Sequence, residues 1–191
     1  MRVFKGFNKD MTCTCGHGTY QYEIGKHYTT EASKTRNTGF HSSEYVLECL
    51  SWYPLGKGRV CVCEAGGDIN EDGEDIVSST EITVMLELSL PEIAYEAALY
   101  MVRYQSRRWK RSGNLLSVKS DTAEVRGAGI AIARGENPKV KVGEGGYGVL
   151  LKEEDGKITN MRLLMARAGR GKEPDTWYTL NEAGEVVKCN E

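Results

Sequence analysis

Glycine occurs in two blocks along this chain, and that distribution limits the folds that the chain can adopt. Of the 22 glycines, ten lie at or before Gly73 and twelve lie at or after Gly113, with none between them. Glycine is disfavoured inside helices and is the residue that tight turns need, so each block is typical of a region with many turns. The sequence therefore predicts two turn-rich regions that flank one glycine-free segment.

The glycine-free segment predicts one long helix. Ser89 can cap it, Pro91 suits its first turn, and Glu92 stands three residues after the serine, as in a capping box. Apolar residues follow at helical spacing until Gly113 ends the pattern. They are Ile93, Ala97, Tyr100, Met101 and Tyr104. We expect a helix over about residues 91–110.

The region before this helix reads as short strands separated by glycine and Asx turns. Alternating or apolar runs predict strands at residues 3–7, 20–24, 60–63 and 82–88. A short helix with a serine cap is expected over residues 42–50, ended by Pro54. These elements predict an α+β domain over residues 1–111, with a small mixed sheet and the long helix at its end.

The region after Gly113 contains a short repeat. Residues 123–127 (Ala-Glu-Val-Arg-Gly) resemble residues 139–143 (Lys-Val-Lys-Val-Gly), sixteen positions later, and another short strand pattern follows each of them. A strand punctuated by glycine at a fixed interval is what a β-roll needs, although two copies are fewer than the three that a solenoid normally requires. Residues 112–191 are therefore predicted to be β-rich, either as a meander or as a short β-roll, in a chain that is α+β overall.

Charge is unevenly placed, although the net charge is only −2. Residues 59–88 carry one basic and eight acidic side chains, whereas residues 89–111 carry five basic and two acidic ones. Residues 66–75 read as a solvated acidic loop, and the predicted helix ends in basic residues with interleaved aromatic rings that suit phosphates and bases. The candidate binding residues are Asp68, Glu71, Asp72, Glu74, Asp75, Arg103, Arg107, Arg108, Trp109, Lys110 and Arg111.

The six cysteines include two C-x-C pairs, and this spacing is a poor zinc signal because a zinc knuckle usually has two to four intervening residues. In a strand, Cys61 and Cys63 point to the same face, which favours small buried side chains in a reduced protein. An alternative is a metal site. Its ligands would be Cys13, Cys15 and His17, completed by His27 or His41. No cofactor is expected.

A catalytic alternative groups His41 with Glu23 and Tyr22, beside Lys5 or Arg2, in a cleft of the N-terminal sheet. General acid–base chemistry needs a histidine of near-neutral pKa beside a carboxylate. By analogy of fold alone, such a site suggests a small enzyme of the ADP-ribosyltransferase type. His41 could equally be a structural strap that hydrogen-bonds a loop to the sheet, and we favour that role.

Several motifs resemble a known family. Residues 3–7 (Val-Phe-Lys-Gly-Phe), Cys13, residues 21–26 (Gln-Tyr-Glu-Ile-Gly-Lys) and residues 39–41 (Gly-Phe-His) are similar to an uncharacterised domain of phage and gut-bacterial proteins, over about residues 1–90. Residues 174–180 (Pro-Asp-Thr-Trp-Tyr-Thr-Leu) resemble the tail of longer proteins of that group. Those proteins carry Gly/Ala-rich repeats, which also occur in β-roll heads of surface adhesins. The resemblance implies a phage or prophage context and no established activity.

These observations favour a phage accessory protein that acts by binding, not by catalysis. We expect it to antagonise a bacterial immune effector, as an anti-CRISPR or similar anti-defence protein does, with its acidic stretch imitating phosphate charge. The expected partner is a host bacterial protein in the cytoplasm, with nucleotide or nucleic acid as a further partner and no membrane. A nucleotide-sequestering protein, a structural phage protein and the small enzyme remain alternatives, and monomer and homo-oligomer remain open.

Overall fold

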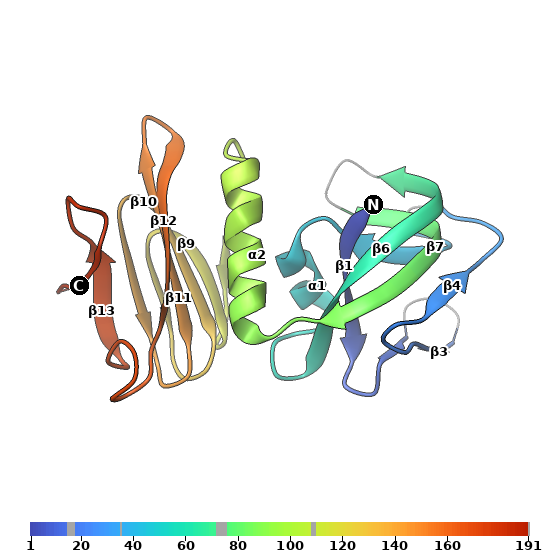
Figure 1. Cartoon of the computed structure of the whole chain (residues 1–191), viewed down its shortest axis with the longest axis horizontal. Coiled ribbons are helices and arrows are strands. Elements are labelled where there is room, and N and C mark those ends of the chain that lie inside the picture. Colours follow the sequence, from blue (N-terminus) through green and yellow to red (C-terminus); the bar gives the residue numbers. More distant parts are fainter. Residues whose placement is uncertain (15–17, 35, 72–75, 108–109, 191) are drawn as a thin grey trace. The chain divides into compact units, whose positions relative to one another are not determined.

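Strands make up most of this chain, which a computed structural model describes over residues 1–14, 18–34, 36–71, 76–107 and 110–190. They form two compact units, Met1–Ser89 and Leu90–Glu191 (Figure 1). The helix α2 (Leu90–Arg103) opens the second unit, whereas the sequence grouped that segment with the first. Each unit has its own hydrophobic core, so each is described by itself.

The first unit is an antiparallel sheet that closes on itself. Its elements are β1 (Arg2–Asn8), β2 (Thr12–Cys13), β3 (Tyr20–Gln21), β4 (His27–Thr29), β5 (Phe40–Ser43), α1 (Val46–Trp52), β6 (Gly58–Glu71) and β7 (Ile76–Glu87). Strand β1 pairs with β5 and β6, and β7 pairs with β5 and β6 in turn, so these four strands form a ring. Strand β4 joins the edge of β7, and β2 pairs with β3. All these pairings are antiparallel, so the predicted mixed sheet is wrong.

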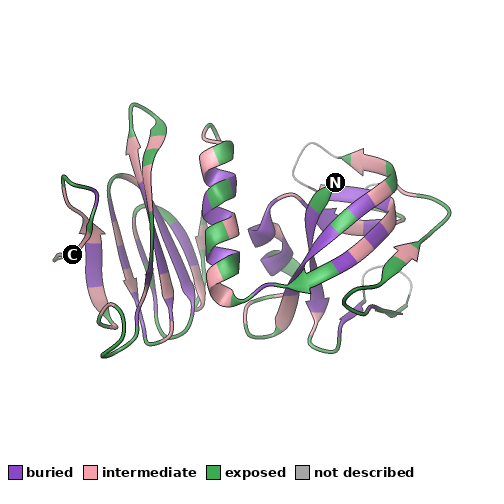
Figure 2. Ribbon diagram, in the orientation of Figure 1, coloured by how far each residue is buried: buried purple, intermediate pink, exposed green. Residues whose placement is uncertain are grey.

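Alternate residues of β1 and β6 fill the interior of this ring. Val3 pairs with Cys63 and Lys5 with Cys61, so their side chains share one face of the sheet. Val3, Phe7, Cys61 and Cys63 belong to one buried core, drawn in purple in Figure 2. The two cysteines of β6 therefore point inward together, and Lys5 is the one charged residue among these inward positions of β1.

The short helix α1 begins later than the sequence predicts. Ser42 and Ser43 belong to β5. The Ser43 hydroxyl accepts a hydrogen bond from the Tyr45 amide (3.0 Å) and donates one to the Tyr45 carbonyl (3.1 Å). Ser43 therefore shapes the bend between β5 and α1, and the helix itself has no side-chain cap.

The second unit combines α2 with a parallel core of strands. Its strands are β8 (Arg111–Ser112), β9 (Leu116–Val125), β10 (Ile130–Val142), β11 (Tyr147–Glu154), β12 (Lys157–Met165), β13 (Thr176–Leu180) and β14 (Val186–Lys188). Strand β10 pairs in parallel with β9 and with β11, although only a few residues connect each strand to the next. The sequence left a meander and a short β-roll open for this region. Neighbouring strands of a meander are antiparallel, so the parallel pairings are those of a β-roll.

Strands β9 and β10 are each bent, and each forms one rung of the roll. We call the bend between the two halves of such a strand a corner. Residues 116–120 pair with 130–134, and residues 122–125 pair with 139–142. Between these halves β9 has Asp121 alone, at a φ of 59°, whereas β10 has four residues, 135–138. The first half of β10 pairs with β11, and its second half pairs with β13. Strand β10 therefore contributes to two faces of the roll.

The register of the roll differs by one residue from the predicted repeat. Ala123 pairs with Val140 and Val125 with Val142, which is a spacing of seventeen and not sixteen. All four side chains are buried in the interior of the roll. A spacing of sixteen would place Val125 beside Lys141, and a slip of one residue exchanges the buried and exposed faces of a strand. Burial of the apolar side chains therefore decides the register.

Helix α2 packs against β10, β11 and β12 on the outside of the roll. Ala131 and Ala133 belong to the interior core, so the alternating Ile130 and Ile132, also fully buried, face the opposite side, where α2 lies. Small alanines inside and large isoleucines outside allow β10 to be buried on both faces.

The predicted fold class, α+β with a long helix, is wrong, because the described residues are 54% strand and 12% helix. Helix α2 begins directly after Ser89, as predicted, but it ends at Arg103, several residues before Lys110. The carbonyls of Gln105 and Arg107 accept hydrogen bonds from the Arg134 guanidinium, at 2.6 and 3.0 Å. This contact draws the chain away from the helical path, and Arg111 then pairs with β9. In the described part of the chain, neither helix has the length and apolar content that crossing a membrane requires.

Candidate functional site

Lys5 lies at the centre of the predicted catalytic cluster, and the fold uses it to join strands. Its side chain is only 7% exposed, and its Nζ donates a hydrogen bond to the His41 carbonyl at 2.6 Å. Nζ also lies 5.4 Å from the ring centroid of Tyr22 and 5.8 Å from that of Phe7, within range of cation–π attraction. Lys5 thereby links β1 to β5 and to the segment after β3.

His41 is half-buried on β5, and its imidazole hydrogen-bonds to the backbone at Lys34 and Gly39. Its Nε2 is buried and has no hydrogen-bond partner among the described residues. Burial, and after it the charge of Lys5, lowers the pKa of His41 below its ordinary value. These contacts between a strand and the preceding loop agree with the strap role.

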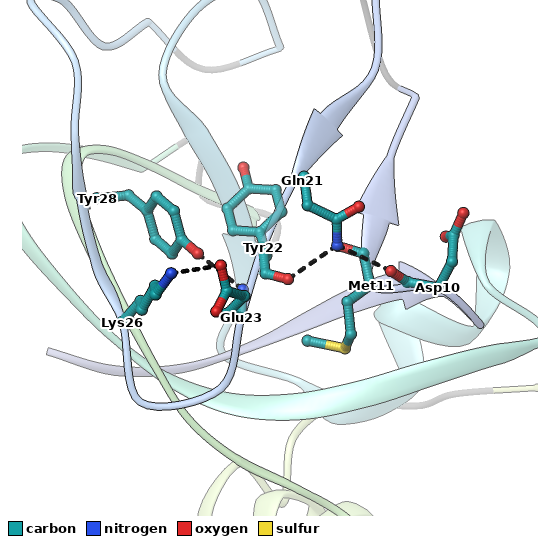
Figure 3. Close-up of polar contacts among 7 residues, drawn as sticks. All are labelled: Asp10, Met11, Gln21, Tyr22, Glu23, Lys26 and Tyr28. Atoms are coloured by element: carbon teal, nitrogen blue, oxygen red, sulfur yellow. Dashed lines mark hydrogen bonds and ion pairs between the residues drawn. The ribbon is translucent and has the colours of Figure 1, made fainter.

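Glu23 is not brought to His41. It lies in the turn between β3 and β4, where its carboxylate is exposed and pairs with the Lys26 ammonium (Figure 3). The Glu23 amide donates a hydrogen bond to the Tyr28 hydroxyl at 2.7 Å. Glu23 is also absent from the groups that shift the pKa of His41. The contacts made by Glu23 thus hold a turn and do not supply a carboxylate to the imidazole.

Tyr22 is buried beside Lys5, and burial raises its pKa. The neighbouring Gln21 side chain donates hydrogen bonds to the carbonyls of Asp10 (2.9 Å) and Tyr22 (3.0 Å), which ties the end of β3 to the turn between β1 and β2 (Figure 3). No structural role for Gln21 was expected from the sequence, and its place beside the Tyr-Glu pair was the available signal. The structure thus brings together Lys5, Tyr22 and His41 and leaves Glu23 outside.

We expect the free energy of unfolding to fall as the pH drops from 7 to 5, and His41 to cause part of that fall. Its pKa is lowered in the folded protein, so below the ordinary value of 6.5 the unfolded chain binds a proton that the folded protein does not. Asparagine keeps a hydrogen-bond donor but does not titrate. Urea unfolding of His41→Asn at pH 7 and pH 5 should therefore show a smaller fall in the free energy of unfolding than wild type shows. His27→Asn, at an exposed histidine, is the matched control, and an equal fall in wild type and His41→Asn would contradict the prediction.

The proposed metal site is not assembled among the described residues, where no group of three metal-ligating side chains is found. Cys13 is buried in the core of the first unit, and its thiol donates to the Gly6 carbonyl at 3.4 Å. Cys15 and His17 lie outside the described residues. Cys13 therefore already has a core position and a hydrogen-bond partner.

We expect iodoacetamide at pH 8 to label Cys189 of the folded protein before Cys13, Cys49, Cys61 and Cys63. These four thiols are free but buried, and burial raises the pKa of Cys49 and Cys61 to about 12 and also raises that of Cys63. The thiolate is the reactive form, and it is scarce at such sites. Peptide mass spectrometry with and without urea measures each cysteine, and rapid labelling of Cys61 without urea would contradict the prediction.

The acidic stretch is only partly a loop. Strand β6 extends to Glu71, so the expectation of a loop from residue 66 is wrong. Asp68 lies at a bulge of β6, and its carboxylate accepts hydrogen bonds from Ser33 Oγ and Asn70 Nδ2, each at 3.3 Å. Glu71 is exposed at the end of β6. Asp72, Glu74 and Asp75 lie outside the described residues.

The basic residues do not share one helix end. Arg103 is the exposed last residue of α2, and Arg111 lies in β8. Arg107 donates to the Tyr100 hydroxyl at 3.1 Å, and its guanidinium lies 5.2 Å from the Tyr104 ring centroid. Arg108 and Trp109 lie outside the described residues. The predicted anion-binding helix end is therefore wrong in its geometry, because the helix stops before most of these residues.

A groove of about 750 Å³ in the second unit takes in one of them, Lys110. Its other walls include the corner of β9 at Asp121, the corner of β10 at residues 135–137 and the turn at residues 155–156. Arg134, 8% exposed, also lines it, and the Arg134 Nε donates to Glu153 Oε2 at 2.6 Å. This groove was not expected from the sequence, and the Gly-Glu-Asn-Pro run at residues 135–138 inside an apolar stretch was the signal that could have indicated a corner.

Comparison with known proteins matches one of the two units. A family model described as a domain of unknown function, DUF7666, matches residues 1–96, just over half of the chain. This span contains the whole first unit and the first turns of α2. No curated protein and no solved structure matches the chain.

Proposed function

The chain belongs to the DUF7666 family, and we propose that its first unit is a module that binds another protein and is not an enzyme. One observation carries the proposal: the side chains that were candidates for catalysis make structural contacts instead. Lys5 joins two strands, the His41 Nε2 is buried, and Glu23 pairs with Lys26 in an exposed turn. A general base must be able to reach the substrate, and His41 has no carboxylate partner among the residues that the structure describes.

The acidic end of the β6–β7 hairpin is the surface that we propose for docking. Glu71 is exposed there, and the sequence adds Asp72, Glu74 and Asp75 in the connection to β7. We leave Asp68 out of the docking set because its carboxylate is already hydrogen-bonded to Ser33 and Asn70. Concentrated negative charge on a hairpin favours a partner with a basic surface and speeds the association of the two.

The partner that we propose is a bacterial immune effector with a basic groove for nucleic acid. The acidic hairpin would occupy that groove in place of phosphates, in the cytoplasm of a bacterial host. This part of the proposal rests on the charge of the hairpin and on the resemblance to phage and gut-bacterial proteins.

Affinity capture from a bacterial lysate tests the proposal. We expect the full chain to retain a nucleic-acid-binding protein and the variant Glu71→Lys/Asp72→Lys/Glu74→Lys to retain about tenfold less, because reversed charge repels a basic surface. The purified pair should bind more weakly as salt increases. The matched control is Glu23→Gln/His41→Asn, which alters the catalytic candidates and should capture as much partner as wild type.

Two results would overturn the proposal. Capture that survives charge reversal would exclude the hairpin as the docking surface. If Glu23→Gln/His41→Asn still captured the effector but no longer inhibited it, the result would favour an enzyme.

A further inference from the structure

Lys5 carries a buried positive charge that has no acidic partner in the described part of the chain. Its Nζ donates one hydrogen bond, to the His41 carbonyl, and forms no ion pair with any described carboxylate. Lysine is almost never fully buried in proteins unless it is paired. An ammonium group has three hydrogen-bond donors, so this one has both spare donors and an uncompensated charge.

Two aromatic rings supply part of the compensation. The faces of Phe7 and Tyr22 attract the Lys5 ammonium from 5.8 and 5.4 Å. These rings carry no net charge, so the buried cation still lacks a counter-charge.

Ser42 lies beside Lys5 in the interior of the ring of strands. Phe4 pairs with Ser43 in antiparallel register, so Ser42 stands opposite Lys5 and the two side chains share one face of the sheet. Val77, which pairs with Ser42 on its other side, belongs to the interior core. Ser42 is 7% exposed, and its buried hydroxyl has no hydrogen-bond partner among the described residues. A single small ligand can satisfy this hydroxyl and the spare donors of Lys5 together.

The buried charge favours an anion over a water molecule at this place. Water can satisfy the hydrogen bonds, but it leaves the positive charge uncompensated. An anion accepts hydrogen bonds from both groups and also neutralises the charge. The thiol of Cys61, opposite Lys5 on β6, does not supply the negative charge, because burial raises its pKa to about 12.

The neighbouring side chains favour a small ion. Cys61, Lys5, Ser42 and Val77 follow one another across β6, β1, β5 and β7, and all four are buried. Protein interiors are close-packed, so an ion of one atom suits this row better than a polyatomic ligand does.

We propose that the interior of the first unit binds one chloride ion, held between the Lys5 ammonium and the Ser42 hydroxyl. The ion links β1 to β5 and stabilises the folded unit, because a ligand that binds only the folded state opposes unfolding. The site is inside the sheet and is separate from the acidic hairpin that we propose for docking.

Urea unfolding of the full chain in sodium chloride and in sodium gluconate tests this site. The two salts give equal ionic strength, and gluconate is too large for the interior. A site with a Kd of about 20 mM lowers the ratio of unfolded to folded protein about tenfold at about 200 mM chloride, relative to gluconate. Chloride should also slow hydrogen exchange more in β1 and β5 than in β10 and β11, which belong to the other unit.

Three variants locate the effect. Lys5→Met keeps an unbranched side chain without the charge, so its stability should be equal in the two salts. Ser42→Ala removes one hydrogen bond, so chloride should bind about fivefold more weakly. Lys26→Met, at an exposed lysine that pairs with Glu23, is the matched control and should keep the full chloride effect.

Equal stability of the wild type in chloride and gluconate would overturn the proposal. A full chloride effect in Lys5→Met would also overturn it, because the ion would then bind elsewhere. If Lys5→Met does not fold, Ser42→Ala decides, and a full chloride effect in that variant has the same meaning. These measurements involve no partner, so their outcome is independent of the docking of the hairpin.

Discussion

Replacing Arg134 with alanine is expected to lower the free energy of unfolding of the second unit by about 3–5 kcal/mol. The guanidinium is buried and makes three contacts, with the Glu153 carboxylate and with the carbonyls of Gln105 and Arg107. Its removal deprives the largely buried Glu153 carboxylate of this ion pair and the segment after α2 of two hydrogen bonds. Urea unfolding followed by circular dichroism measures the loss.

The control is the exposed pair of Lys152 and Glu154, whose N–O distance is 2.8 Å. Lys152→Ala should cost no more than about 1 kcal/mol, because water screens this pair. The double variant Arg134→Met/Glu153→Met should recover much of the loss, since well-packed apolar residues often replace a buried ion pair without cost. Equal effects of Arg134→Ala and Lys152→Ala would show that burial of the first pair has no energetic consequence.

Replacing Gly143 with alanine is expected to destabilise the roll by about 3 kcal/mol, the upper part of the range for overpacked sites. A Cβ on Gly143 would lie 2.1 Å from the Gly127 nitrogen and 2.7 Å from the Gly127 Cα. Both neighbours are backbone atoms of the adjacent rung, so no side chain can turn away to relieve the contact. Thermal and urea unfolding of the variant measure the effect.

Gly113→Ala provides the comparison. Its Cβ would lie 3.6 Å from the Leu116 carbonyl, an ordinary contact, so we expect a change within about 0.5 kcal/mol. If the two variants were equally stable, the close approach of the rungs at Gly143 would not limit the fold.

Local patterns in the sequence located several elements well. Strand β1 covers the predicted residues 3–7, and α2 begins at the predicted cap, Ser89. Alternation and capping involve residues that are neighbours along the chain, so they are legible without knowledge of the fold. The glycines of the short repeat, Gly127 and Gly143, also indicated a roll, although the spacing of the repeat did not give its register.

The candidate site was harder to predict, because it depends on which charged side chains become buried. No local pattern in the sequence marks Lys5 or Arg134 as buried, yet they are 7% and 8% exposed. Their partners, the His41 carbonyl and Glu153, are 36 and 19 residues away along the chain. No short window of sequence contains both members of either pair.

The sequence by itself determined several of the turns and the alternation within strands such as β1, because glycine conformation and the spacing of apolar residues act over a few positions. Only the tertiary structure decided that β9, β10 and β11 pair in parallel and that α2 stops at Arg103. It also decided that Val125 pairs with Val142, seventeen residues later. These outcomes follow from burial of the valines inside the roll and from the hydrogen bonds of one buried arginine. Both are energies of contact between segments that only the fold brings together.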